Sequence, residues 1–201
     1  MSMENGPVAC TWEVHETRGL ETAWITLDDD GLAARGRAVG LAPEPYWVTY
    51  TLETGKQQVT RRLAVTVEPA WEVDARRLEL LRSPDGTWSV DGVVLAGLTG
   101  AVDCDLAFSL LTNTMPILRH QLHQRPGAAD LVMAWVSLPD LAVHRSEQRY
   151  EHLRHTADGA VVRFAAGSFT ADLEVDADGL VVRYPQLGAR LERTAERRRR
   201  L

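Results

Sequence analysis

The chain has 201 residues, of which 45% are hydrophobic and 25% are charged, and its formal net charge is −6. The apolar share is enough for a packed core and excludes a disordered chain. The acidic balance argues against general nucleic-acid binding, which requires a basic face. No secretory leader opens the chain, and no apolar run approaches the roughly 20 residues of a membrane-spanning helix. We therefore expect a cytoplasmic protein without an integral membrane segment.

The chain is predicted to be one domain over residues 1–201, because no Gly/Ser/Pro-rich linker divides it. Residues 193–201 form a basic tail that ends in four consecutive arginines before the last leucine. A terminal basic run is typical of a solvated end, and binding to anionic lipid or nucleic acid is the lesser alternative.

Short segments of alternating polarity predict β-strands joined by tight turns. In the clearest segment, Phe169, Ala171, Leu173 and Val175 alternate with polar residues. Asp-Gly pairs begin at Asp30, Asp85, Asp91, Asp158 and Asp178, and they suit hairpin turns because glycine accepts positive φ angles. The predicted strands are 8–14, 23–27, 46–53, 58–67, 77–81, 131–138, 160–164, 168–175 and 180–184.

Two segments break this pattern. Residues 112–124 are expected to become helical after Pro116, and residues 146–154 are expected to form a short helix with Ser146 as its N-cap. The predicted fold is therefore mainly β, a single antiparallel domain that forms a roll or partly closed barrel with one or two short helices.

Few residues stand out for chemistry. Asp103 and Asp105 lie on one face of an extended segment, where they could bind a ligand, do acid/base work or only accept backbone hydrogen bonds. Arg61 lies on the apolar face of its predicted strand. Such a charge is either paired at a polar cavity or displaced by a β-bulge, and the pattern does not decide between them.

Other candidates favour structural roles. The pairs His120/His123 and His152/His155 have a spacing that could hold a metal, but no third ligand follows, so no metal site is expected. Cys10 and Cys104 are expected to be buried thiols. Most of the six tryptophans belong to the core, and one or two facing a cavity would suffice for binding. No serine-nucleophile motif occurs.

The stretch Val102–Arg119, V-D-C-D-L-A-F-S-L-L-T-N-T-M-P-I-L-R, resembles the pattern of the bacterial putative glycolipid-binding family. Segments 19–22, 134–143, 148–150 and 168–185 add to the resemblance in the expected order. Leu110 and Leu118 depart from it, since the family tends to have proline and arginine there. The resemblance implies a spiral β-roll that holds a small amphiphilic, glycolipid-like ligand inside a curved sheet, with no cofactor. The expected ligand-binding residues are Asp103, Asp105, Thr112, Asn113, Thr114, Arg119, Gln148 and Tyr150 from the segments that carry the resemblance, together with Arg61 and Trp71 from outside them.

A non-enzymatic binding protein is the leading interpretation. The first alternative is an enzyme of unrecognised class with an Asp/Arg/His pocket, which would show polar groups converging on one pocket. The second is a protein-interaction module, which would show a filled roll and an exposed apolar patch. The oligomeric state does not follow from the sequence.

Overall fold

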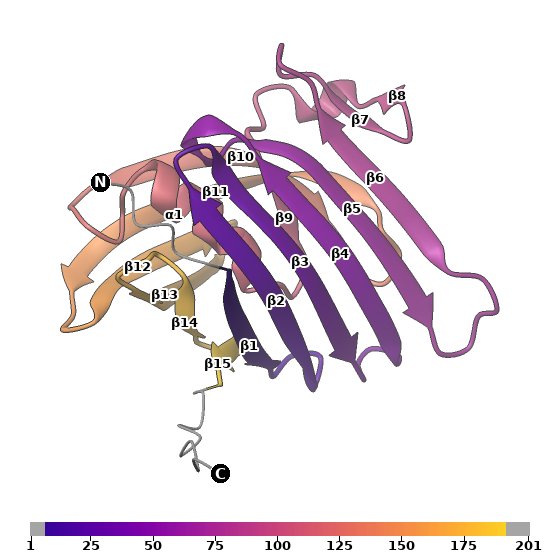
Figure 1. Cartoon of the computed structure of the whole chain (residues 1–201), viewed down its shortest axis with the longest axis horizontal. Coiled ribbons are helices and arrows are strands. Elements are labelled where there is room, and N and C mark those ends of the chain that lie inside the picture. Colours follow the sequence, from indigo (N-terminus) through magenta and orange to yellow (C-terminus); the bar gives the residue numbers. More distant parts are fainter. Residues whose placement is uncertain (1–6, 192–201) are drawn as a thin grey trace, which may run out of the picture.

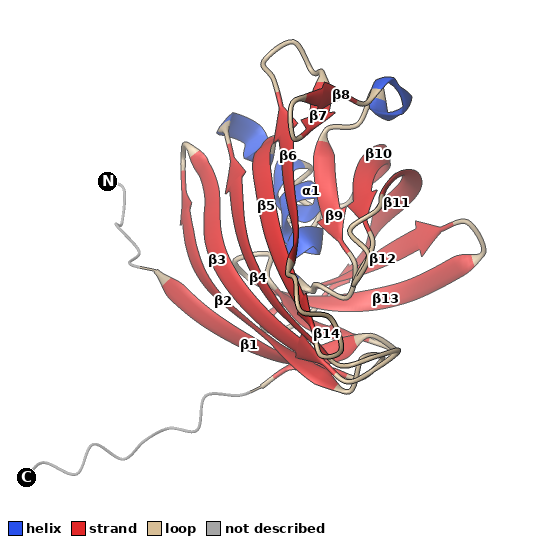
Figure 2. Cartoon of the chain, turned by 90° about the vertical axis from the view of Figure 1, so that its right-hand side faces the viewer, coloured by secondary structure: helices blue, strands red, loops and turns tan. Residues whose placement is uncertain are grey.

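A computed structural model describes residues 7–191, which form one sheet of fifteen strands that curls into a roll without closing (Figures 1 and 2). The strand order is β8-β7-β6-β5-β4-β3-β2-β1-β15-β14-β13-β12-β11-β10-β9. The mainly β, single-domain spiral roll is thus confirmed. The basic tail lies outside the described residues.

Nine of the fifteen strands correspond to predicted ones, and the other six were not predicted as strands. The strands are β1 (Val8–Val14), β2 (Gly19–Asp28), β3 (Gly31–Gly40), β4 (Tyr46–Thr54), β5 (Thr60–Pro69), β6 (Arg76–Arg82), β7 (Trp88–Val90), β8 (Val93–Val94), β9 (Asp103–Leu106), β10 (Ala128–Val136), β11 (Val143–His155), β12 (Gly159–Ala166), β13 (Phe169–Asp176), β14 (Val181–Tyr184) and β15 (Gly188–Arg190). The helical turns are η1 (Lys56–Gln58), η2 (Ala96–Leu98), η3 (Leu111–Asn113) and α1 (Thr114–Arg119).

The Asp-Gly pairs lie where the sequence predicts turns between neighbouring strands. Asp91 and Gly92 join β7 to β8 with φ angles of 49° and 84°. Two positive φ angles in succession are the requirement of a type I′ turn, which matches the twist of the strands that it joins.

The roll is a spiral because β9, the strand at one end of the sheet order, lies inside the first half of the sheet. One side of β9 pairs in parallel with β10, and across the roll β9 contacts β5. The backbone N–H of Cys104 donates to the Thr60 hydroxyl at 3.1 Å. A buried edge strand needs such partners, since each unpaired backbone group inside a protein costs free energy.

Thr60 reaches this position because of a bulge in β5. Leu52 lies opposite Leu63, but Thr54 lies opposite Thr60, so β5 contains one extra residue at this point. The bulge turns Thr60 to the interior and leaves Arg61 exposed on the outer surface. Of the two alternatives for Arg61, the structure shows the β-bulge.

The predicted helix over residues 146–154 is wrong. These residues lie within β11, paired with β10 on one side and β12 on the other. Local helix formers such as Glu147 and Gln148 are overridden here because two ladders of backbone hydrogen bonds hold the segment extended. The other predicted helical segment does contain α1, which is six residues long.

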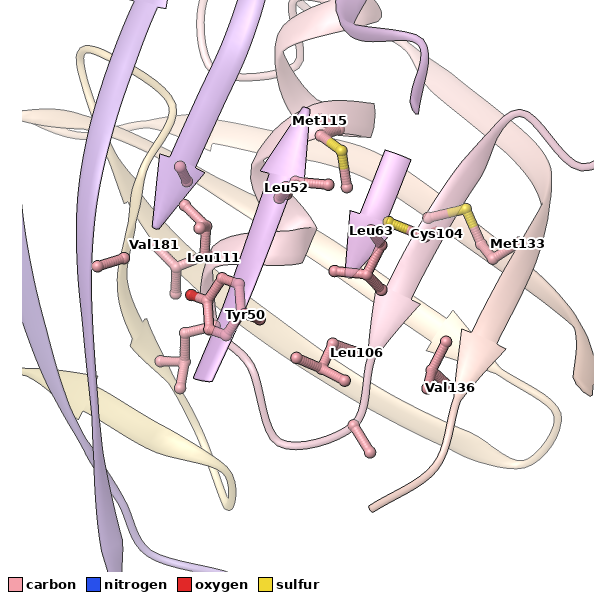
Figure 3. Close-up of a cluster of buried hydrophobic side chains, with 14 of the residues drawn as sticks. Tyr50, Leu52, Leu63, Cys104, Leu106, Leu111, Met115, Met133, Val136 and Val181 are labelled. Atoms are coloured by element: carbon pink, nitrogen blue, oxygen red, sulfur yellow. The ribbon is translucent and has the colours of Figure 1, made fainter. Parts of the chain in front are cut away.

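The interior between β4, β5 and the η3–α1 segment is a packed apolar core (Figure 3). Leu52, Leu63, Leu111 and Met115 are fully buried there. In Figure 2 the sheet curves around α1, which occupies the inside of the roll. Cys10 and Cys104 are free, buried thiols. A ligand chain could not thread this part of the roll without displacing side chains.

Candidate functional site

A pocket of about 500 Å³ lies on the inner face of the second half of the sheet, beside the segment that enters η3. We call it the aromatic pocket, and its lining includes Asp105, Asn113, Trp135, Gln148, Phe164 and Phe169. Its volume falls in the range of roughly 300–1,000 Å³ that is usual for small-molecule sites.

The strand register explains why these residues meet. Gln148 on β11 lies opposite Ala166 on β12, which lies opposite Phe169 on β13. Directly opposed residues of antiparallel strands point to the same face. The small Ala166 side chain therefore leaves a gap between Gln148 and Phe169, and this gap lies at the floor of the pocket.

One wall of the pocket is an aromatic cluster. The ring centroids of Phe164, Phe169 and Tyr184 are 5.9–6.3 Å apart, and Tyr150 lies 5.2 Å from Phe164. Phe164 and Tyr184 are buried, whereas Phe169 is 43% exposed at the rim. Trp135 lines another part of the pocket. Such faces can pack against the C–H surfaces of a ligand.

The opposite wall is polar and centres on Asp105. Its Oδ1 accepts a hydrogen bond from the Thr112 hydroxyl at 2.8 Å, and its Oδ2 accepts one from Gln148 Nε2 at 2.7 Å. Burial raises the pKa of the Asp105 carboxyl, and these two hydrogen bonds offset part of that rise. The result is a fixed carboxyl group at the edge of an aromatic pocket.

A second polar pair extends this wall. The Tyr150 hydroxyl lies 2.9 Å from Asn113 Oδ1 and 3.2 Å from Gln148 Oε1. Five of the residues implied by the family resemblance therefore join one connected network: Asp105, Thr112, Asn113, Gln148 and Tyr150.

The segment between β9 and η3 is held in place by a buried carboxylate on β2. Glu21 accepts hydrogen bonds from the Ser109 hydroxyl at 2.6 Å, from the Leu110 N–H at 2.7 Å and from the Tyr50 hydroxyl at 2.7 Å. Burial raises the pKa of Glu21, and the three donors lower it in part. Because Ser109 and its neighbour Phe108 line the aromatic pocket, Glu21 positions one of its walls.

Asp103 and Arg119 lie apart from this network. They form a two-pronged ion pair, with Arg119 Nη1 2.6 Å from Asp103 Oδ1 and Nη2 bonded to Oδ2. Asp103 is fully buried, and Arg119 is exposed only at the edge of a different hollow, beside His120 and His123. Their contacts tie α1 to β9.

The remaining expected residues also lie away from the pocket. Thr114 is buried in α1, and its hydroxyl has no hydrogen-bond partner among the described residues. Trp71 is 77% exposed in the loop between β5 and β6. Arg61 is on the outer surface, as described above.

The expectation that most of the six tryptophans belong to the core is wrong: Trp12 and Trp88 are buried, but Trp24, Trp47 and Trp71 are more than half exposed. Trp135 lines the aromatic pocket. Sequence reasoning did not single out Phe164, Phe169 or Tyr184 as site residues. Alternation within β13 does place Phe169 on the same face as Ala171. That face can be assigned to a pocket only once β11 and β12 are aligned beside it.

Two further features bear on the alternatives. Among residues 7–191 there is no cluster of three or more metal-ligating side chains, and no helix there could cross a bilayer. A separate open hollow of about 560 Å³ near the ends of β3 and β5 includes Leu41, Trp47 and Val73, all exposed. With the packed interior, this patch keeps the interaction-module alternative open.

The described residues thus form an all-β spiral roll whose inner face carries a pocket with an aromatic wall and a hydrogen-bonding wall. Residues 9–190 match the model of the putative glycolipid-binding family, and the chain belongs to that family. It is similar to a solved structure of a DUF1089 family protein from Pseudomonas aeruginosa, with 31% identity over 85% of this chain and 92% of that chain and a TM-score of 0.69. No match was found among curated proteins.

Proposed function

We propose that this protein binds an amphiphile by holding its sugar-like head group in the aromatic pocket. The observation that carries the proposal is the meeting of the Phe164–Phe169–Tyr184 cluster with the Asp105–Gln148 pair across one pocket of about 500 Å³. Aromatic faces pack against the apolar faces of sugars, while amide and carboxylate groups bond to hydroxyls. Membership of the family supports a ligand of this class.

The acyl part of such a ligand would lie at the rim of the pocket. The interior between β4, β5 and α1 is filled by Leu52, Leu63 and Met115, so it offers no channel for a hydrocarbon chain. The rim, in contrast, carries the exposed ring of Phe169 and the half-buried Leu187. The protein would thus recognise the head group and leave much of the tail outside.

Two measurements test this proposal. Native mass spectrometry of the purified full chain is expected to show a co-purifying amphiphile, and octyl glucoside below its critical micelle concentration is expected to bind saturably, one molecule per chain. Phe169→Ala should weaken this binding by about 5–10-fold, since one aromatic contact contributes roughly 1 kcal/mol. Trp24→Ala is the matched control, because Trp24 is an exposed aromatic that does not line the pocket.

Repeatedly empty spectra together with no saturable binding of the glucoside would overturn the proposal. Equal weakening by Phe169→Ala and Trp24→Ala would also count against it, because the ligand would then not be in the aromatic pocket.

An enzyme acting on a sugar-like substrate is the second candidate. It is favoured by one observation: the pocket lining contains the carboxyl groups of both Asp105 and Glu16. Burial raises the pKa of the Asp105 carboxyl, as expected of a general acid. In a glycoside-cleaving enzyme Asp105→Asn would abolish turnover of an aryl glycoside while binding persists. In a binding protein without catalytic activity, neither the wild type nor Asp105→Asn would turn over the aryl glycoside.

A further inference from the structure

Along the wall formed by Asp105, Gln148 and Asn113, hydrogen-bond acceptors outnumber the donors that neighbouring side chains supply. Asp105 accepts one bond at each oxygen, from Thr112 and from Gln148. A carboxylate has about four lone-pair positions, so roughly half of its capacity is unused by the protein. The Gln148 amide is oriented by this contact, because its NH₂ group must face Asp105 and its carbonyl oxygen must face away.

The Tyr150 hydroxyl adds to the excess of acceptors over donors. It has one proton but lies within hydrogen-bonding distance of two carbonyl oxygens, Asn113 Oδ1 at 2.9 Å and Gln148 Oε1 at 3.2 Å. A single proton cannot satisfy both acceptors fully. One amide oxygen is therefore short of a donor, and a ligand that brings O–H groups would supply it.

The charge of the lining also disfavours a ligand that brings further hydrogen-bond acceptors. Its carboxylates are Asp105 and Glu16, and its cation is Arg145. The Arg145 guanidinium donates from Nη1 to the Thr99 carbonyl at 2.7 Å, and its Nη2 lies 3.4 Å from Glu147, a carboxylate outside the lining that balances part of its positive charge. An anionic head group would meet two carboxyl groups and several acceptors, against one cation whose charge Glu147 balances in part.

Resting on the proposed function, we infer that the aromatic pocket selects an uncharged polyhydroxylated ring and excludes head groups that carry a carboxylate, phosphate or sulfate. The hydroxyls donate to Asp105, to Gln148 Oε1 and to Asn113 Oδ1, and the C–H face of the ring packs on Phe164 and Phe169. Selectivity arises because an anion brings acceptors and negative charge to a wall that already has both.

A matched pair of probes tests the inference. Octyl glucoside and octyl glucuronide share the ring and the tail, and they differ in a hydroxymethyl group against a carboxylate. Calorimetric titration of the full chain with each, below micelle formation, is expected to show the glucuronide binding at least about tenfold more weakly. Asp105→Asn should reduce the ratio of the two dissociation constants several-fold, because it removes the carboxyl group from this wall. Asp130→Asn, on the exposed outer side, should leave it unchanged.

The outcomes separate the two claims. Equal or tighter binding of the glucuronide overturns this inference while the proposed function stands. If neither probe binds, the proposed function fails with it. If Asp105→Asn fails to fold, Gln148→Glu is the second variant: it adds a carboxyl beside Asp105 and should widen the ratio, and an unchanged or smaller ratio in that variant contradicts the inference.

Discussion

The Ser109 hydroxyl donates a hydrogen bond of 2.6 Å to the buried carboxylate of Glu21, and this contact joins β2 to the segment that walls the aromatic pocket. The two residues are 88 positions apart in the chain. The same carboxylate also accepts from Tyr50 and from the Leu110 N–H, so it fixes the segment at two successive residues. One side chain thus links the packed half of the roll to the half that carries the pocket.

Glu21→Ala is expected to lower the free energy of unfolding by about 2–4 kcal/mol. The substitution leaves the buried Leu110 N–H without an acceptor and opens a cavity. Both effects lower the free energy of unfolding. Urea denaturation followed by tryptophan fluorescence measures the loss. Glu13→Ala, an exposed glutamate on the adjacent strand β1, is the control and should change stability by less than about 0.5 kcal/mol. Similar losses for the two variants would contradict the assigned role of Glu21.

Stability should also depend on pH through Glu21. Burial raises the pKa of Glu21 above its ordinary value of 4.5, so the folded state holds this proton more tightly than the unfolded state. The contribution of this group is therefore complete below pH 4.5 and is lost as the pH rises through the raised pKa. Between about pH 5 and about pH 8, the melting temperature of the wild type should fall more than that of Glu21→Gln. Parallel curves for the two proteins would show that Glu21 does not titrate in this range.

The Asp103–Arg119 pair should behave as a buried ion pair. Removing the guanidinium with Arg119→Ala leaves a fully buried carboxyl without its partner, which is expected to cost about 3–5 kcal/mol of unfolding free energy. The double variant Asp103→Leu, Arg119→Met should recover most of that loss, because it removes both charges. Arg163→Ala breaks the exposed pair with Asp172 and should cost less than about 1 kcal/mol. A small loss for Arg119→Ala would mean that water or another group compensates Asp103.

Gly36 is required by the close approach of an aromatic ring. A Cβ atom at Gly36 would lie 1.9 Å from the Tyr50 ring, which crosses β3 so that its hydroxyl reaches Glu21 on β2. Gly36→Ala should therefore displace Tyr50 and lower stability by about 2–4 kcal/mol. Gly97→Ala is a matched control with open space around the added atom, and it should be nearly neutral. The predicted role of Gly36 is contradicted if Gly36→Ala and Gly97→Ala both melt at the wild-type temperature.

Local signals in the sequence were sufficient for most of the sheet. Alternation in Phe169–Val175 and the Asp-Gly pairs predicted strands and turns because those features depend on neighbouring residues. The segment at Ser146 was predicted as a helix because its pairing with β10 and β12 is not local. The family resemblance led to Asp105, Asn113 and Gln148, but it could not separate them from Asp103 or Arg119.

The rest of the site depends on contacts between distant segments. Glu21 carries no local sign that its partner is Ser109, and a glutamate in a strand usually faces solvent. Phe169 and Tyr184 become neighbours only when β13 and β14 pair with the correct register. Periodicity can assign each side chain to one of two faces, but it cannot decide which face encloses a pocket.

Filling the floor of the aromatic pocket should abolish binding without unfolding the protein. Ala166→Leu adds a branched side chain between Gln148 and Phe169, in the gap that a head group would occupy. Because the added atoms enter open space, the melting temperature should stay within about 3 °C of the wild type. The affinity for octyl glucoside should fall at least about tenfold, since the ligand would have to displace a packed side chain. Ala165→Leu is the matched control, because the neighbouring residue on β12 points to the opposite face. Retained affinity in Ala166→Leu would place the ligand elsewhere on the roll, whereas loss in Ala166→Leu alone ties binding to this pocket.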